Sequence, residues 1–105
     1  MKASKRKRLR ARGWAVGDAK VFVGLTDEEA VLVELRLDLA ENVRMLRQRS
    51  QLSQQELARR LGSSQSRVAK LEAGDASVSI ELVLRALLQL GTTRRQLARM
   101  ISRAA

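Results

Sequence analysis

The sequence contains no cysteine, histidine, tyrosine or proline, and its only aromatic residues are Trp14 and Phe22. Without cysteine and histidine, the chain has no disulfides, no thiol or imidazole catalyst and none of the usual zinc ligands. Its carboxylates form no recognisable catalytic pair. We therefore expect no enzymatic activity, no metal site and no cofactor. The absence of cysteine also fits a reducing cytoplasm.

Long apolar runs are missing as well, since the longest is "AVLV" at residues 30–33. This run is too short for a transmembrane helix, and the N-terminus lacks the apolar core of a signal peptide. A cytoplasmic protein with no membrane contact is the expectation. The 105 residues suit one domain. The lack of proline, together with many leucine, alanine and arginine residues, indicates an all-α fold.

Charge is distributed unevenly along the chain, whose net charge is +10. Residues 1–12 hold seven basic and no acidic residues, residues 13–43 hold two basic and seven acidic residues, and residues 44–105 hold twelve basic and four acidic residues. The basic C-terminal part favours a polyanionic partner. The acidic middle, with a local charge of −5 (2 minus 7), is either a solvated face or a surface for a basic partner.

Helix signals recur from residue 26 onwards. Thr26 with Glu29 forms a capping-box pattern, and the apolar residues that follow recur at steps of three and four on one face: Leu32, Leu35, Leu39, Val43 and Leu46. We expect one long helix over 26–50, or two helices with a bend near 35–37. Further helices are predicted over 53–61, from Ser63 or Ser64 to Glu72, from Ser79 to about 90, and from Thr93 to about 102. A short helical turn is predicted after Asp18.

Residues 54–73 combine features of a helix-turn-helix motif. Two short helices meet at Gly62, where a positive φ is easiest for glycine. Four apolar residues are spaced to join the two helices: Leu57, Leu61, Val68 and Leu71. The second helix is short and has a polar outer face, as expected of a helix that enters the major groove of DNA. An ordinary helical hairpin is the alternative.

The stretch "LSQQELARRLGSSQSRVAKLEAG" resembles the helix-turn-helix of the phage-repressor-like XRE family, and the segments on either side resemble HigA-type antitoxins and their stand-alone relatives. The resemblance implies a five-helix repressor-like domain over residues 36–105, preceded by a helical extension over 13–35 and a flexible basic arm over 1–12. It further implies a DNA-binding set, carried over by position: Ser53, Gln54, Ser64, Gln65, Ser66, Arg67 and Lys70.

Within that set, the glutamine at position 54 is expected to bind a phosphate and to brace Gln65. The side chain of Gln65 can then make two hydrogen bonds to adenine, and Lys70 can reach guanine or a phosphate. The family usually has glycine at position 51, so Gln51 or Ser50 must adopt the conformation that ends the preceding helix. A solvated Gln65 without a partner is the alternative.

The expected function is sequence-specific binding of double-stranded operator DNA by a homodimer that represses transcription. Residues 97–101 and a ridge of Val33 and Leu37 are the candidate dimer interfaces. A HigA-like antitoxin would also bind a small basic RNase-like toxin, through a stripe of four carboxylates: Asp27, Glu34, Asp38 and Glu41. The alternatives are a stand-alone repressor, an interaction module whose motif no longer reads DNA, and an RNA-binding protein, which the scarcity of aromatic residues disfavours.

Overall fold

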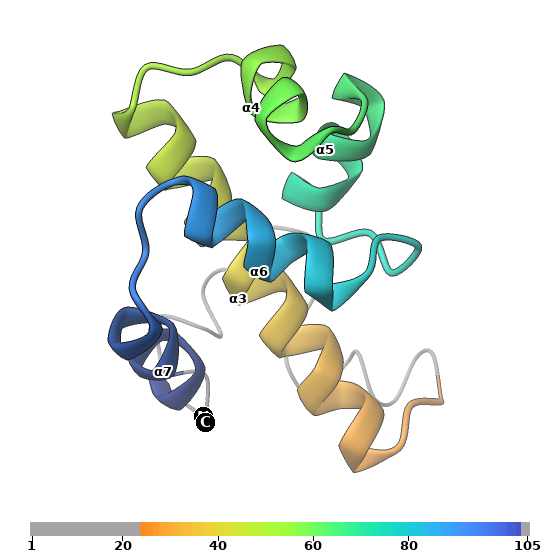
Figure 1. Cartoon of the computed structure of the whole chain (residues 1–105). Helices are drawn as coiled ribbons and strands as arrows, with labels where there is room; N and C mark the ends of the chain where they lie inside the picture. The colour runs from red at the N-terminus through yellow and green to blue at the C-terminus, as the bar shows by residue number, and fades with distance from the viewer. Residues whose placement is uncertain (1–23, 104–105) are drawn as a thin grey trace.

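A computed structural model describes residues 24–103, so the predicted basic arm and the predicted turn after Asp18 lie outside the described residues. In this range all regular structure is α-helical: α3 (Asp27–Arg49), α4 (Gln54–Leu61), α5 (Gln65–Glu72), α6 (Ile80–Gln89) and α7 (Arg94–Arg103). Figure 1 shows α4 and α5 together at one end of the long helix α3, with α6 across its middle and α7 at the far side from α5. The all-α prediction is confirmed.

The helices begin where the cap residues predicted them to begin. The Thr26 and Ser53 hydroxyl oxygens accept hydrogen bonds from the backbone N–H three residues later. The carboxylates of Glu29 and Glu56 in turn accept from the backbone N–H of Thr26 and Ser53. Thr93 and Gln96 make the same reciprocal pair before α7, with hydrogen bonds of 2.8 and 3.1 Å. Each box satisfies backbone donors that the first helical turn leaves unpaired. Ser64 and Ser79 cap α5 and α6 through a single side-chain bond each.

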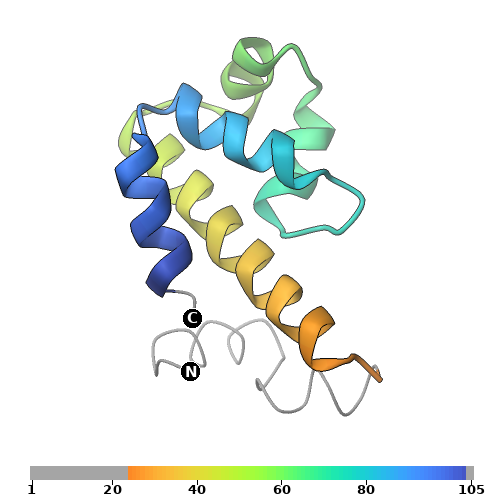
Figure 2. The ribbon, with the colours of Figure 1, turned by 60° about the horizontal axis from the view of Figure 1, so that its bottom comes forward.

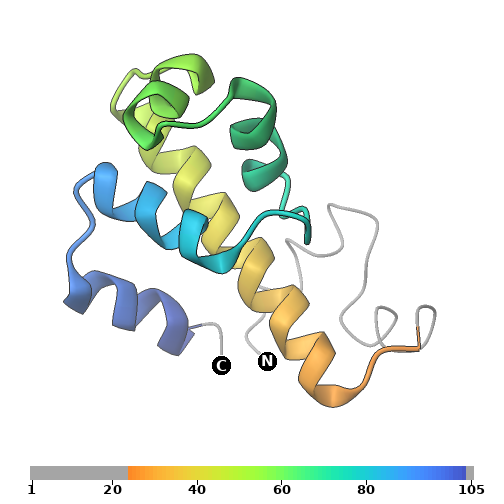
Figure 3. The ribbon, with the colours of Figure 1, turned by 45° about the vertical axis from the view of Figure 1, so that its right-hand side comes forward.

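The α3 helix is continuous over its 23 residues, so of the two predicted alternatives the single helix is correct. It also runs through the domain boundary placed between residues 35 and 36, and the described part of the extension therefore shares a helix with the DNA-binding domain. The prediction that Leu32 belongs to the core face is wrong, because Leu32 is 55% exposed. In Figures 2 and 3 the N-terminal half of α3 projects beyond the other described helices, so that face has no helical partner there.

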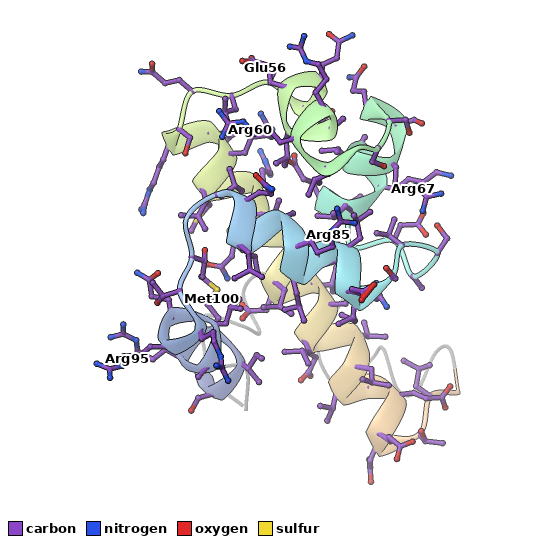
Figure 4. All side chains as sticks on the ribbon, viewed as in Figure 1. Glu56, Arg60, Arg67, Arg85, Arg95 and Met100 are labelled. Atoms are coloured by element: carbon purple, nitrogen blue, oxygen red, sulfur yellow. The ribbon has the colours of Figure 1, made fainter. Side chains whose placement is uncertain are left out.

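The core lies where α4, α5 and α6 cover the C-terminal half of α3. Each helix contributes fully buried apolar side chains to one cluster, among them Leu39, Val43, Leu57, Val68, Leu71, Val83 and Leu87. Removing such side chains from water contributes roughly 1.5–3 kcal/mol each. Met100 connects α7 to the same cluster, and Figure 4 shows it pointing from α7 toward the bundle. Within the described range, no helix is both long and apolar enough to cross a membrane.

Gln51 adopts the left-handed conformation that ends α3, with a φ of 57°. Its N–H donates to the carbonyl of Gln48 and the N–H of Leu52 donates to the carbonyl of Arg47, which is the Schellman arrangement. The prediction that position 50 or 51 takes this role is confirmed for Gln51.

Gln51→Gly is expected to raise the free energy of unfolding by about 1 kcal/mol. A side chain in the left-handed region costs roughly 1–2 kcal/mol, and the larger backbone entropy that glycine loses on folding offsets part of this gain. Gln51→Ala is the control, because alanine keeps the unfavourable conformation. Urea denaturation measures both variants, and equal stability of the glycine and alanine variants would contradict the argument.

Candidate nucleic-acid interface

The turn between α4 and α5 depends on Gly62, which has a φ of 65°. The N–H of Ser63 donates to the carbonyl of Ala58 at 2.8 Å and closes the end of α4. A Cβ at Gly62 would meet no atom within 4 Å, so glycine is favoured there by backbone conformation and not by lack of space. Leu57 and Leu61 of α4 then face Val68 and Leu71 of α5 in the core cluster. The predicted motif is present in the described structure.

The α5 helix has two distinct faces. Its inner face consists of Val68, Leu71 and Glu72, which are buried. The outer face carries the predicted DNA-binding residues of this helix, all exposed: Gln65, Ser66, Arg67 and Lys70, with Ser64 at the cap. At eight residues α5 is about 12 Å long. An α-helix with its side chains is about 10–12 Å in diameter, which fits the width of the major groove. Figure 4 shows the side chain of Arg67 directed away from the bundle.

A buried ion pair fixes the far end of α5. The Nε of Arg47, on α3, donates to Oε2 of Glu72 at 2.6 Å, and a second guanidinium nitrogen donates to Oε1 at 3.0 Å. A third donates to the carbonyl of Leu52 at 2.8 Å. Hydrogen bonding to Glu72 raises the pKa of Arg47. Burial of the guanidinium opposes this increase, and the negative charge of Glu72 adds to it. The guanidinium therefore joins α3, the turn before α4 and the end of α5.

Gln54 takes part in the same network. Its amide nitrogen donates to Oε1 of Glu72 at 3.1 Å, so one of its two N–H groups points into the protein. Two predictions for Gln54 stay untested by this geometry: that it braces Gln65 and that it binds a phosphate. The second N–H of the Gln54 amide is the group that could make either contact. The neighbouring Ser53 hydroxyl accepts from the backbone of Glu56 at 3.0 Å. Its own hydrogen is the donor that a phosphate would use.

A polar hollow of about 300 Å³ lies beside the outer face of α5. It is lined by Ser64, Ser66, Arg67 and Lys70 together with Ser77 and Val78 from the loop before α6. The backbone N–H of Ser77 donates to Asp75 at 2.8 Å. Hydrogen bonding from Ser77 lowers the pKa of Asp75, and the charges of Lys70 and Arg36 lower it further. Three hydroxyls and two cations thus surround a space next to the groove-facing helix.

Sequence reasoning did not assign a role to Arg47, Glu72, Arg36, Arg85 or Ser77. Arg85 of α6 donates to the carbonyl of Leu61 at 3.3 Å, and Arg36 of α3 donates to the carbonyl of Val78. Arg85 therefore contacts the end of α4, and Arg36 contacts the loop that follows α5. A signal for Glu72 was available: it follows Val68 by four residues, so it lies on the buried face of α5 and needs a cationic partner. Nothing in the sequence alone singles out Arg47 as that partner.

The predicted carboxylate stripe is not an exposed surface. Asp27 is exposed and Glu41 is half-buried, but Glu34 and Asp38 are only 7% and 5% exposed, and all four residues make contacts within the chain. The prediction of four accessible carboxylates is therefore wrong for Glu34 and Asp38. A helical wheel places residues on faces of an isolated helix, and it cannot show which faces other parts of the chain cover.

Two short helices joined by a glycine turn, with a buried inner face and a polar, cationic outer face on the second helix, define a helix-turn-helix protein. A sequence model described as helix-turn-helix domain matches residues 38–100, well over half of the chain. The protein belongs to this family, and it has a DNA-binding domain. Comparison with curated proteins gives no match, and comparison with solved structures gives none either.

Proposed function

We propose that the protein is a sequence-specific transcriptional repressor of the XRE type, which binds a pseudo-palindromic operator as a homodimer in the cytoplasm. The α5 helix enters the major groove with Gln65 at its start and Lys70 one turn and a half further along. Serine hydroxyls and backbone N–H groups at the start of α4 and α5 contact phosphates. The resemblance of residues 52–74 to phage-repressor motifs supports the XRE assignment.

The observation that carries this proposal is the difference between the buried inner face and the exposed outer face of α5. The buried residues hold the helix, whereas Gln65, Arg67 and Lys70 make no hydrogen bond or ion pair through their side chains within residues 24–103. The rigid helix already fixes the backbone of these residues, so binding orders only their side chains, and no hydrogen bond or ion pair within the described residues has to be given up. The arrangement is what readout of base edges requires.

The small size of α5 is the reason for proposing a homodimer. An eight-residue helix contacts only a few base pairs, too few to select a site in a genome. Two copies would place two α5 helices roughly 34 Å apart, one turn of DNA. Of the predicted interface at 97–101, Ile101 is exposed, whereas Leu97 is half-buried and Met100 is buried. The ridge of Val33 and Leu37 is half-buried.

Selection of random duplex oligonucleotides by the full chain tests this proposal. The expected result is an enriched pseudo-palindrome with half-sites about one helical turn apart, and a two-to-one protein to DNA ratio by light scattering. Absence of an enriched motif would leave a helix-turn-helix fold without sequence reading. An enriched single half-site with one chain bound would contradict the dimer.

A second candidate function is that of an antitoxin, which binds a small basic toxin as well as DNA. One surface favours it: Val31 and Leu32 are 57% and 55% exposed at the start of α3, beside the exposed Asp27 and Glu28. This end of α3 lies far from α5 in Figure 1, so a partner bound there leaves the recognition helix accessible. Apolar anchors surrounded by carboxylates suit a cationic protein.

Co-expression with the product of an adjacent gene for a small basic protein tests the antitoxin role. Val31→Asp combined with Leu32→Asp is expected to abolish co-purification and to leave operator binding unchanged. Leu88→Asp is the matched control, since Leu88 is also an exposed apolar residue but lies on α6. If both sets of variants retain the partner equally well, the surface on α3 is not its binding site. If the wild-type chain captures no such partner, the stand-alone repressor is the better assignment.

A further inference from the structure

A large hollow of the described structure lies on α3 and α7, away from the recognition helix. It has a volume of about 650 Å³ and is lined by the C-terminal half of α3, the Leu90–Thr92 connection and α7. No residue of α4 or α5 lines it. Figures 1 and 2 show α7 beside this half of α3, at the other side of the domain from α5.

The lining of this groove is apolar inside and cationic at its edges. Leu46, Leu90 and the buried Met100 supply apolar surface, and Met45 is a further, exposed methionine. The guanidinium groups of Arg49 and Arg99 are exposed on α3 and α7. Neither makes an ion pair within residues 24–103.

No carboxylate stands among the lining residues. Within residues 24–103, the groove therefore has two positive charges that no ion pair neutralises, beside an apolar surface, in a chain whose net charge is +10. Such a surface attracts anions over a distance. A guanidinium binds a carboxylate or sulfonate through two parallel hydrogen bonds, which a neutral head group cannot match.

We propose that this groove binds an amphipathic organic anion, a small molecule with an apolar chain or ring and one acidic head group. Its volume lies in the range of about 300–1,000 Å³ that small-molecule sites occupy. The head group pairs with Arg49 and Arg99, and the apolar part lies on Leu46, Leu90 and Met100. The two methionines adapt to ligands of different shape, since their side chains are unbranched and flexible.

A second copy of the chain is a poorer occupant of this groove. The α7 helix also carries Arg94 and Arg95, both exposed, and Figure 4 shows Arg95 directed away from the domain. Packing α7 of two copies together would oppose these like charges with no carboxylate of the groove to separate them. The groove contains no residue of the α4–α5 motif, but Arg99 and Met100 belong to the predicted dimer interface at 97–101, so a ligand and a second copy of the chain would compete for it.

The groove lies next to the turn that leads into the helix-turn-helix motif. Arg49 is the last residue of α3, immediately before the Ser50–Leu52 turn that leads to α4. The α7 helix packs chiefly against α3. A ligand that pairs with both arginines would connect α7 to the end of α3 next to α4. A small molecule could in this way change the position of α4 relative to α3.

Decanoate is a suitable probe, with decanamide as its uncharged analogue. Isothermal titration calorimetry of the full chain is expected to show saturable binding of one decanoate per chain. Amide chemical-shift changes should be confined to the second half of α3, residues 90–92 and α7. Arg49→Gln combined with Arg99→Gln should weaken binding at least about tenfold, since both charge-assisted contacts with the head group are lost. Decanamide should bind the wild type more weakly by a similar factor.

Arg94→Gln combined with Arg95→Gln is the matched control, because it also removes two positive charges, from exposed residues that do not line the groove. These variants should bind decanoate as the wild type does. Because all four arginines are exposed, both double variants should keep the helical circular dichroism signal of the wild type. The proposal is overturned if both double variants lose binding equally, if the shift changes map elsewhere, or if no saturable binding occurs. It is equally overturned if sedimentation shows a dimer whose formation shifts the groove resonances and excludes decanoate.

Discussion

Glu72→Ala is expected to destabilise the domain by about 3–5 kcal/mol, because it leaves a guanidinium buried without its counter-ion. The side chains of Arg47 and Glu72 are only 12% and 5% exposed, so water replaces little of the lost interaction. Gln54 also loses its acceptor. A change of this size is a large share of the stability of a domain of this length. Urea denaturation followed by circular dichroism measures it.

Two further variants separate the charge from the packing. Glu72→Gln keeps the shape and one acceptor oxygen, so it should be less harmful than Glu72→Ala. Arg47→Met combined with Glu72→Leu removes both charges, and this double variant should be more stable than either single removal, because no unpaired charge stays buried. A loss below about 1 kcal/mol for Glu72→Ala would show that the pair is solvated in solution and contributes as little as a surface ion pair.

Gln65→Ala is expected to weaken binding to the selected operator by roughly 1–3 kcal/mol and to relax the base preference at one position of each half-site. The Gln65 side chain is exposed and makes no hydrogen bond within residues 24–103, so thermal unfolding should be unchanged. Lys70→Ala should also weaken binding. If Lys70 contacts a phosphate, the loss is similar for all sequences, and the slope of log K against log salt falls by about one per half-site.

Gln89→Ala is the matched control for Gln65→Ala, since Gln89 is an exposed glutamine on α6. Competition binding with the selected operator and with single-base variants at fixed salt gives both affinity and preference. If Gln65→Ala and Gln89→Ala bind alike and discriminate alike, Gln65 is a solvated residue, and base reading must lie with other side chains of α5.

The helix boundaries could be predicted because each depends on residues close together in the sequence. A hydroxyl at the cap and a glutamate or glutamine three residues later satisfy each other whatever lies beyond them, as Ser53 with Glu56 and Thr93 with Gln96 show. Gly62 was predictable for the same reason, since its backbone conformation is a local property. The polar face of α5 followed from helical spacing alone.

Contacts between distant segments could not be predicted in this way. The pairing of Arg47 with Glu72 joins residues 25 positions apart, and many other arginines in the sequence are equally plausible partners. The same limit explains the errors on α3. Leu32 fits the apolar spacing of the helix but lies beyond the part that the bundle covers, whereas Glu34 and Asp38 fit a polar face that the folded chain largely buries. Periodicity defines the faces of a helix, and only the tertiary structure assigns each face its surroundings.

The separation of the two faces of α5 has a consequence for how this protein can change over evolution or by engineering. The residues that orient the helix are Val68, Leu71 and Glu72, and none of them faces outward. Gln65, Arg67 and Lys70 can be exchanged for other side chains without touching those three. Under the proposed function, new operator preferences are accessible by substitution at a few surface positions, with the scaffold unchanged. Transplanting the outer face of another recognition helix onto α5 should then transfer its preference to this chain.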